Sequence, residues 1–285
     1  MKAAPFDYLR PDAPDDVVAE LEQAGGSAKV LAGGQSLLPV LAMRLGRPTA
    51  LIDITRVRDW DRWDERDGWL RIGAAVRQRT AERQLADRLP LLGYALPFVG
   101  HREIRSRGTI CGSLAHADPA AELPAVAVTL AARLRIRGRQ GERTVAAADF
   151  FTGAMTTALG PGEVLGAVEF PLPTPGEGYA LAEVARRHGD FALVGVVARV
   201  RVRDGEEVES ARLTCFGVAD RPQVRDVTEL MSAGPPTADD LAALADEVTT
   251  TAGDRHGDVA YRRRLVRVLG ARELGRAARR AGAAR

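Results

Sequence analysis

The chain has 285 residues, of which 46% are hydrophobic and 27% are charged, as in soluble globular proteins, and this composition excludes disorder throughout. Its 40 basic and 38 acidic residues leave a net charge of +2, which argues against a dedicated nucleic-acid-binding protein. The length allows one large domain or two of moderate size.

Helix and strand signals alternate in the first part of the chain. Pro14 opens a run of helical periodicity that Gly25-Gly26 ends, and a Gly33-Gly34 turn separates a strand from a short helix. The predicted elements are helices over 14–24, 36–44, 77–106 (interrupted by Pro90 and Pro97) and 123–132, and strands over 29–32, 49–54, 69–72, 134–136 and 163–170. The alternation within the first 55 residues indicates an α/β unit.

A boundary is predicted at residues 171–178, which hold three prolines and two glycines, as linkers and long turns do. Strands are then expected over 179–186, 192–203 and 208–218, and helices over 224–232, 238–251 and 258–280. Strands followed by helices indicate a second α+β domain, in which helices back a small sheet.

The last segment, 255–285, contains ten arginines and two acidic residues. Such a tail can bind nucleic acid or an acidic partner. We favour an amphipathic helix with a solvated arginine side, because several apolar residues fit one helical face: Tyr261, Leu265, Val268, Leu269 and Leu274.

The two cysteines, Cys111 and Cys215, are too few for a disulfide scaffold, a cysteine-rich zinc site or an all-cysteine iron–sulfur site. The first residues contain no apolar signal-peptide core, and the longest apolar stretches, such as 191–198, are too short to cross a bilayer. We therefore expect a cytoplasmic protein without a membrane span.

The common catalytic motifs are absent, including the Rossmann glycine fingerprint, the Walker lysine and the zinc-protease helix motif. A metal site could be drawn from His116, Asp118 and Glu122, but histidines in loops near a helix start are more often simple polar residues. We expect no metal in this chain.

A first glycine-rich segment, Leu31-Ala32-Gly33-Gly34-Gln35-Ser36-Leu37, connects a predicted strand to a helix start. Successive backbone N–H groups in such a turn can point at one spot, and the lack of Cβ atoms lets an anion approach closely. Gln35 and Ser36 can add hydrogen bonds. The alternative is a tight structural turn without a ligand.

The second glycine-rich segment, 108–119, is long for a turn and mixes small residues with hydroxyls. Asp118 before Pro119 predicts a helix N-cap, with Glu122 in the first turn as a partner of the helix dipole. Two anion-binding loops together suit a ligand with two linked phosphates. From the residues alone, this ligand and purely structural roles both remain open.

At these two segments, KVLAGGQSLLP and RGTICGSLAHADPAAELPAV, the chain resembles the FAD-binding medium subunits of molybdenum hydroxylases. The likeness is to the carbon monoxide dehydrogenase and xanthine dehydrogenase FAD-domain family. ARRHGDFALVGVVARV at 185–200 is similar to the same subunits, and the resemblance covers essentially the whole chain.

The resemblance implies an α+β fold. It consists of a vanillyl-alcohol-oxidase (PCMH)-type FAD-binding domain at 1–175, with subdomains at about 1–55 and 56–175, followed by a C-terminal domain of the CO dehydrogenase flavoprotein type at 176–285. FAD would bind non-covalently, since no His or Cys stands where the family forms a covalent flavin link. The residues expected to contact FAD are Leu31, Ala32, Gly33, Gly34, Gln35, Ser36, Leu37, Gly108, Thr109, Ile110, Cys111, Gly112, Ser113, Glu122, Leu165 and Phe191.

In the resemblance, Glu122 matches an acidic residue that reaches toward the flavin or its ribityl-diphosphate, and Phe191 matches a position near the isoalloxazine. The chain departs from the pattern at Cys111, where many members have glycine, and we interpret this thiol as packing against FAD. Glu183 stands where some relatives have a lysine that favours a negatively charged reduced flavin. This replacement leaves the flavin potential and the terminal electron acceptor open.

The resemblance also implies a division of labour between subunits. The molybdenum cofactor would lie on a large subunit and two [2Fe–2S] clusters on a small one, in a dimer of heterotrimers. This chain would pass electrons from the clusters through FAD to an acceptor, and it would have no catalytic residue of its own. The alternatives are a self-sufficient flavin oxidoreductase with its own small organic substrate, and a binding module that has lost FAD. The substrate pocket would lie on another chain, so the sequence names no substrate.

Overall fold

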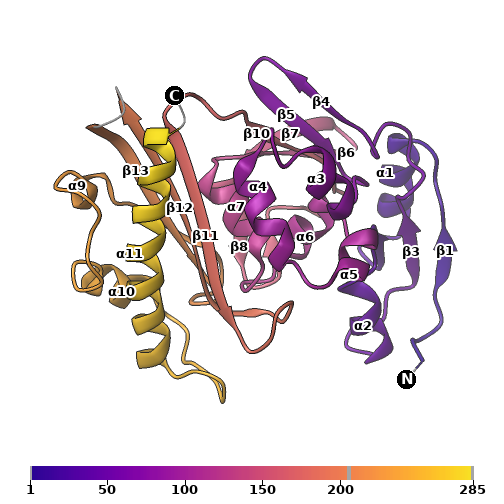
Figure 1. The fold of residues 1–285 in the computed structure, drawn as a ribbon. Coiled ribbons are helices and arrows are strands. Elements are labelled where there is room, and N and C mark those ends of the chain that lie inside the picture. The colour runs from indigo at the N-terminus through magenta and orange to yellow at the C-terminus, as the bar shows by residue number, and fades with distance from the viewer. Residues whose placement is uncertain (1, 204–206, 284–285) are drawn as a thin grey trace.

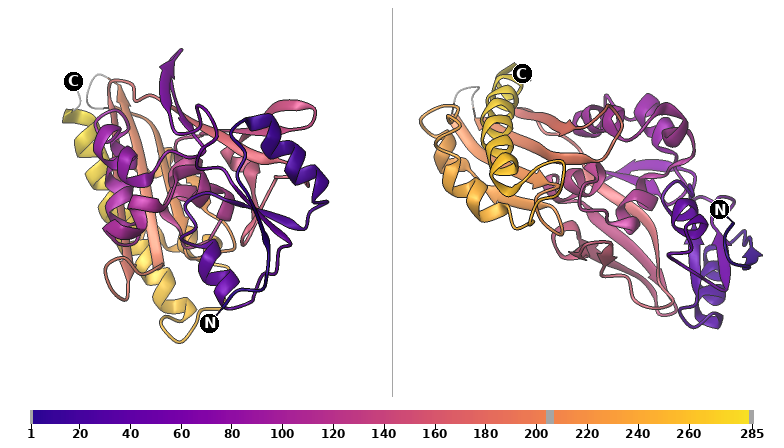
Figure 2. Two further views of the ribbon diagram at one scale, coloured as in Figure 1. Left: turned by 90° about the vertical axis from the view of Figure 1, so that its right-hand side faces the viewer. Right: turned by 90° about the horizontal axis from the view of Figure 1, so that it is seen from below.

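A computed structural model describes residues 2–203 and 207–283 of the chain. Three larger sheets and their helices form a row of lobes, with the N-terminal sheet and the C-terminal helix at opposite ends (Figures 1 and 2). In the described part of the chain, no helix combines the length and apolar character needed to cross a bilayer.

The N-terminal lobe is a parallel three-stranded sheet in the order β1-β3-β2. Helix α1 buries Val17, Val18 and Leu21 in the core, which is why its sequence shows helical periodicity. The elements are β1 (Asp7–Leu9), α1 (Pro14–Gln23), β2 (Ala28–Leu31), α2 (Leu37–Ala42) and β3 (Ala50–Asp53). Both loops that follow β2 and β3 lie at the carboxyl edge of this sheet, where ligands of parallel sheets commonly bind.

The middle lobe is an antiparallel sheet in the order β4-β5-β10-β6-β7, with helices packed on one face. Its strands are β4 (Trp63–Arg66), β5 (Trp69–Gly73), β6 (Arg133–Gly138), β7 (Gly141–Ala146) and β10 (Val164–Pro171), and β8 (Phe151–Gly153) and β9 (Thr156–Thr157) form a small separate pair. Its helices are α3 (Gln78–Gln84), α4 (Pro90–Ala95), the 3-10 helix η1 (Leu96–Phe98), α5 (Arg102–Arg107), α6 (Ile110–His116), α7 (Glu122–Thr129) and α8 (Ala147–Phe150).

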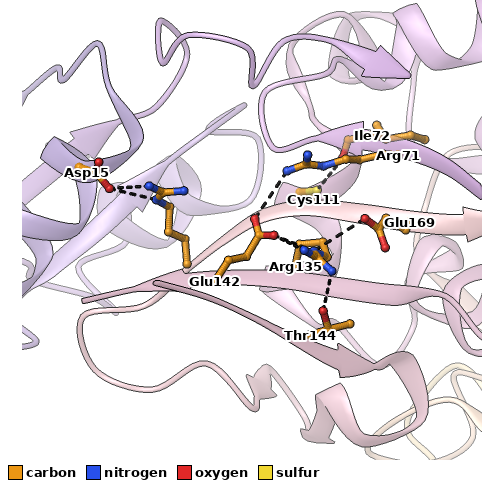
Figure 3. A network of polar contacts seen from close by, with 9 residues as sticks. Asp15, Arg71, Ile72, Cys111, Arg135, Glu142, Thr144 and Glu169 are labelled. Carbon is orange, nitrogen blue, oxygen red and sulfur yellow. Dashed lines mark hydrogen bonds and ion pairs between the residues drawn. The ribbon is translucent and has the colours of Figure 1, made fainter. Parts of the chain in front are cut away.

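The other face of the middle sheet carries a polar network (Figure 3). Arg135 donates to Glu142 and, at 2.7 Å, to Thr144 on β7, and it lies 3.7 Å from Glu169 on β10. Arg71 on β5 reaches Glu142 at 3.6 Å. These exposed ion pairs join four neighbouring strands on the solvent side, and each contributes on the order of 0–1 kcal/mol.

The C-terminal lobe is an antiparallel sheet in the order β11-β12-β13-β14, covered on one face by the long helix α11. On its opposite face the sheet contacts α4 and α7 of the middle lobe. The first part of the central strand β12, residues 192–198, is therefore covered on both faces, which explains its continuous apolar sequence. The elements are β11 (Glu177–Ala185), β12 (Ala192–Arg203), β13 (Glu207–Phe216), β14 (Gln223–Asp226), α9 (Thr228–Met231), α10 (Ala242–Val248) and α11 (Val259–Ala283).

The two faces of β11 and β12 belong to two different cores. Tyr179, Leu181 and Val197 pack into the core of the N-terminal and middle lobes. Ala180 and Val196 pack into a second core under α11. The chain enters this sheet after the connection at 172–176, within the segment where the prolines predict a boundary.

Several sequence predictions are wrong in detail. The segment 108–119 is not one long loop, because it contains helix α6. Asp118 does not cap α7, because the N-cap residue of that helix is Ala121. The Asp118 carboxyl instead accepts from the backbone N–H of Ala120 at 2.8 Å. Residues 223–226, where a helix was expected to begin, form the edge strand β14. Local patterns could not reveal this strand because its ladder partner, β13, is supplied by the tertiary fold.

The predicted apolar face of the last helix is also partly wrong. Tyr261 and Val268 are exposed, whereas Arg262 and Glu273 are buried. Arg262 donates to the carbonyl oxygens of Leu193 and Gly217, at 2.5 and 2.7 Å. The guanidinium therefore provides hydrogen-bond donors for two backbone carbonyls at the end of the sheet. Burial of this arginine depends on those carbonyls, which the helical periodicity does not reveal.

Candidate functional site

The two glycine-rich segments lie in direct backbone contact, although 75 residues separate Gly33 from Gly108 along the chain. A Cβ atom on Gly33 would lie 2.4 Å from the carbonyl oxygen of Arg107 and 2.6 Å from the Cα of Gly108. A Cβ on Gly112 would lie 3.5 Å from the Cβ of Ala32. Glycine at these positions lets the loop after β2 and the start of α6 form one continuous surface.

The first segment leaves several backbone donors available. Gly34 has φ +73°, a conformation that glycine adopts at little cost, and its carbonyl accepts from Leu38 N–H at 3.0 Å. The backbone N–H groups of residues 33–36 donate to no acceptor within the described residues. The Gln35 side chain instead donates to the carbonyl of Gly33 at 3.0 Å, so its amide stabilises the turn. Such a group of adjacent free N–H donors is a site for an anion.

The second segment is held in place by the start of α6. Thr109 is the N-cap residue, and its hydroxyl accepts from the N–H of Gly112 at 2.9 Å. The N–H of Ile110 donates to the carbonyl of Val76 at 3.2 Å. Ile110 is fully buried, and Gly112 and Ser113 are half-buried beside the first segment. This arrangement presents the backbone at 111–113 toward the first segment.

Two neighbouring residues that the sequence analysis did not identify support this geometry. The guanidinium of Arg77 donates to the carbonyl of Arg107, the same oxygen that closely approaches Gly33. Gln78 donates through its backbone N–H to the Gly108 carbonyl at 2.8 Å and through its side-chain amide to the Thr109 carbonyl at 3.3 Å. No motif marks either residue, because their partners are backbone carbonyls about 30 residues away.

The charge at this contact suits a phosphate ligand. Neither Arg77 nor Arg107 forms an ion pair within the described residues, and burial together with the nearby charge of Arg107 lowers the pKa of Arg77. The charge of Asp53 also acts on Arg77, but neither arginine forms an ion pair with it among the described residues, so two cations beside free backbone N–H groups favour an anion. The residues present therefore fit the diphosphate of a dinucleotide.

The remaining candidate residues lie on other elements. Leu165 is buried in β10, next to an irregularity in the pairing with β6 between Leu165 and Ala167. Phe191 is 66% exposed at the end of the turn between β11 and β12. That turn reaches the middle lobe, since a Cβ on Gly189 would lie 3.0 Å from the His101 ring, just before α5.

Two carboxyl groups, one on α7 and one on β11, form no ion pair within the part of the chain that the structure describes. Glu122, in the first turn of α7, is 7% exposed, and burial together with the charge of Asp118 raises its pKa to about 7. Burial and the charge of Glu122 raise the pKa of Glu183 on β11 to about 8. Within the described residues, no group of three or more His, Cys, Asp or Glu side chains is arranged to hold a metal ion.

Cys111 lies in the first turn of α6, buried against the middle sheet, where its thiol faces the Ile72 carbonyl at 3.7 Å (Figure 3). Burial raises the pKa of the thiol to about 12, so it stays protonated and unreactive at neutral pH. The side chain packs in the main core.

We expect the Cys111→Gly protein to retain one FAD per chain, because the thiol supplies neither charge nor an essential hydrogen bond. The cost is about 1 kcal/mol of stability from the lost packing and the added backbone freedom. The ratio of flavin to protein absorbance and the melting temperature measure both effects, with Cys111→Ala as the control that preserves helix propensity. Loss of FAD from both variants would show that the thiol has a role in binding.

The joined glycine segments, with free backbone N–H groups beside Arg77 and Arg107, define a candidate dinucleotide site in a protein built from two α+β lobes and a C-terminal sheet. Residues 4–173 match the family "FAD binding domain in molybdopterin dehydrogenase", and residues 179–277 match the "CO dehydrogenase flavoprotein C-terminal domain". The chain belongs to this family of FAD-binding oxidoreductase subunits.

Individual relatives agree with this assignment over nearly their full length. The chain is 34% identical to the alpha subunit of the 6-hydroxypseudooxynicotine dehydrogenase complex of Paenarthrobacter nicotinovorans, covering 99% of this chain and 97% of that one. It is also 34% identical to the carbon monoxide dehydrogenase medium chain of Afipia carboxidovorans, covering 97% and 98%.

Solved structures show the same fold. A chain of reconstituted CO dehydrogenase from Oligotropha carboxidovorans superposes with a TM-score of 0.92 at 33% identity, covering 98% of this chain and all of that one. A chain of quinoline 2-oxidoreductase from Pseudomonas putida 86 gives a TM-score of 0.90 at 33% identity, covering 99% and 100%. The expected family and fold class are confirmed.

Proposed function

We propose that this protein is the electron-transfer subunit of a heteromeric molybdenum hydroxylase, in which it carries FAD between iron–sulfur clusters of a small subunit and a terminal acceptor. The observation that carries the proposal is the contact between the two glycine segments. It places free backbone N–H groups beside two unpaired arginines, as a bound diphosphate requires.

Bound FAD would supply the redox chemistry, and the protein would supply binding, orientation and electrostatics. In this proposal the N–H groups of Gly33 to Ser36 bind the diphosphate, the start of α6 at 111–113 lines the other side, and Arg77 holds the second segment against the first. Phe191 and the turn at 186–191 would then contact the flavin end of the ligand. FAD would be bound without a covalent link.

Partner subunits are needed because this chain has two buried cysteines and cannot bind the clusters itself. The large subunit would carry the molybdenum cofactor, and two copies of the three-subunit unit would associate. The proposal is supported by the names of relatives, which include complex subunits and medium chains.

A candidate surface for the small subunit lies beside the glycine segments. Four exposed apolar side chains lie on or beside α2 and on α5, the elements that flank the contact between Gly33 and Arg107: Leu38, Met43, Leu45 and Ile104. Exposed apolar side chains grouped in this way are typical of interfaces. A permanent interface of this kind buries on the order of 2,000 Å² or more. The outer arginines of α11 are weaker candidates, since Arg263 and Arg267 pair with Asp246 and Asp239.

We expect the isolated, FAD-loaded chain to show no flavin reduction by the substrate of the complex, because it lacks the centres that oxidise substrate. Anaerobic stopped-flow absorbance near 450 nm (about the usual flavin band) measures this, and addition of the two partner subunits should restore fast bleaching. Dithionite reduction of the same sample is the control that the bound flavin is redox-active.

The partners themselves can be identified by mass spectrometry of what co-purifies with the native chain. Recovery of one molybdenum-containing and one iron–sulfur subunit is the expected result. Fast bleaching by the isolated chain, without any partner, would contradict the relay and favour a self-sufficient flavin oxidoreductase.

A further inference from the structure

The second glycine segment is bonded to a short stretch of chain, residues 76–78, at the start of α3. An isolated antiparallel bridge joins Arg77 to Thr109. Beside it, the backbone N–H of Gln78 donates to the Gly108 carbonyl at 2.8 Å. The position of the second glycine segment is therefore set by this stretch, which lies about 30 residues earlier in the chain.

The side chains of Arg77 and Gln78 extend this bonding. The Arg77 guanidinium donates to the Arg107 carbonyl, and the Gln78 amide donates to the Thr109 carbonyl at 3.3 Å. Together with the Gly108 carbonyl, three successive carbonyl groups of the second segment accept from these two residues. A carbonyl oxygen is the negative end of its peptide dipole, and one that faced a phosphate would repel it. Residues 77 and 78 supply donors to all three.

The Gln78 side chain also fixes Gly108 relative to the first segment. Gln78 is 4% exposed, and its Oε1 atom is buried without a hydrogen-bond partner among the described residues. A Cβ on Gly108 would lie 2.6 Å from this oxygen, and a Cβ on Gly33 would lie 2.6 Å from the Gly108 Cα. Gly108 thus contacts Gly33 and the Gln78 amide at once. An acceptor left unpaired in this way is costly, so the position of this amide calls for a reason beyond packing.

The Arg77 guanidinium lies beside the first glycine segment. The carbonyl oxygen that it binds, that of Arg107, lies 2.4 Å from the Cβ position of Gly33. Gly33 begins the run of backbone N–H groups that have no acceptor in the described part of the chain. A guanidinium has five N–H donors, and the protein within 2–203 and 207–283 supplies an acceptor, the Arg107 carbonyl, for only one of those of Arg77. The other donors are available to a ligand at the same place.

No carboxylate forms an ion pair with Arg77 in the described ranges. Asp53, whose charge reaches Arg77, already accepts from the Tyr8 hydroxyl and from the Thr55 N–H at 2.8 Å. The charge of Arg107 acts on Arg77 as well, and it has the same sign. A half-buried guanidinium beside a second cation is stabilised by an anion, and its planar fork suits the oxygens of a phosphate.

We propose that Arg77 is a phosphate-binding residue of the FAD site and that Gln78 is the positioning residue that holds the second glycine segment for it. This inference rests on the proposed function, which puts the diphosphate at the glycine contact. One N–H of Arg77 binds the Arg107 carbonyl and the others bind the diphosphate, so one guanidinium links the ligand to the second segment. Gln78 acts through Gly108 and Thr109 and touches no atom of the ligand.

The role of Arg77 is tested with Arg77→Met, Arg77→Lys and the control Arg139→Met, which removes the same charge from the exposed turn between β6 and β7. FAD is titrated into the FAD-free chains by fluorescence quenching at several salt concentrations. Arg77→Met should bind FAD about tenfold more weakly or worse, as for a lost hydrogen bond to a charged group. Its affinity should also depend less on salt than that of wild type, because one charge contact with the ligand is missing.

Arg77→Lys should keep the salt dependence of wild type and recover part of the affinity, and Arg139→Met should match wild type in both. A purely structural role would lower the affinity of Arg77→Met without changing its salt dependence. Wild-type affinity or wild-type salt dependence in Arg77→Met would overturn the role of Arg77.

The role of Gln78 is tested with Gln78→Glu, which has nearly the same shape. A neutral carboxyl can donate its O–H to the Thr109 carbonyl, whereas an ionised one cannot and puts a negative charge near the ligand. The FAD affinity of Gln78→Glu relative to wild type should therefore rise about tenfold or more from pH 9 to pH 6, because burial disfavours the ionised form. Gln78→Met, which cannot donate, should be weakened by the same factor at both pH values. A constant ratio in Gln78→Glu would overturn the role of Gln78.

A comparison with Gly33→Ala separates this inference from the proposed function. If Gly33→Ala loses FAD while Arg77→Met binds it like wild type, the diphosphate site stands and the role of Arg77 is wrong. If Gly33→Ala keeps full FAD occupancy, the proposed function loses the observation that carries it. Since Arg77 is only half-buried, its variants decide the inference even where a Gln78 variant does not fold.

Discussion

Replacing Gly33 with alanine is expected to empty the site of FAD while the protein stays folded. The added methyl group would lie 2.4 Å from the Arg107 carbonyl oxygen and 2.6 Å from the Gly108 Cα, well inside contact distance for backbone atoms that cannot rotate away. The two glycine segments must then separate, and the diphosphate loses the donors of one side. We expect FAD affinity to fall at least tenfold, or about 1.4 kcal/mol or more. Gly33→Val should be more severe.

The measurement is flavin content after gel filtration, with titration of FAD into the FAD-free protein by fluorescence quenching. Gly46→Ala is the matched control, because the nearest atom to its added methyl group is the Leu41 Cδ2 at 3.6 Å. Far-UV circular dichroism should be unchanged in both variants. Full FAD occupancy in Gly33→Ala would show that this contact does not form the diphosphate site.

The Gly178→Ala substitution is expected to lower the free energy of unfolding strongly. Gly178 lies on β11 beneath the C-terminal helix, where a Cβ would lie 2.0 Å from the Ala277 carbonyl oxygen and 2.3 Å from the Ala281 N. Either the helix lifts from the sheet or the strand shifts in register, and both open the second core. We expect a loss of ~4 kcal/mol or more, in the range of severe overpacking.

Urea unfolding followed by circular dichroism measures this effect. Gly275→Ala on the same helix is the control, because its nearest neighbour lies 3.5 Å away and the exchange favours the helix by up to about 1 kcal/mol. Equal stability of Gly178→Ala and wild type would mean that α11 does not seat directly on β11.

The main helices and central strands could be predicted from local patterns. The helix over 14–24 and the strands near 29–32, 49–54 and 192–203 were found because each has strong periodicity or a continuous apolar run bounded by glycine or proline. Short polar strands such as β1, β4 and β7 were missed, since their ladder partners rather than their own residues stabilise them.

The glycine segments of the candidate site could be predicted from the sequence, but the residues that hold them in place could not. Two segments rich in glycine were visible in the sequence, and motif resemblance joined them to one cofactor. Arg77 and Gln78 could not be found, because they bind backbone carbonyls of the second segment and any sequence supplies such carbonyls.

The sequence by itself therefore determined the family, the type of cofactor and the lack of cysteines for iron–sulfur clusters, because these depend on residue identity and short spacing. Only the tertiary structure decided that Gly33 contacts Arg107 and Gly108, and that the buried carboxylate of Glu177 pairs with Arg199. Such contacts join distant parts of the chain, and burial and partner geometry arise only when the lobes pack together.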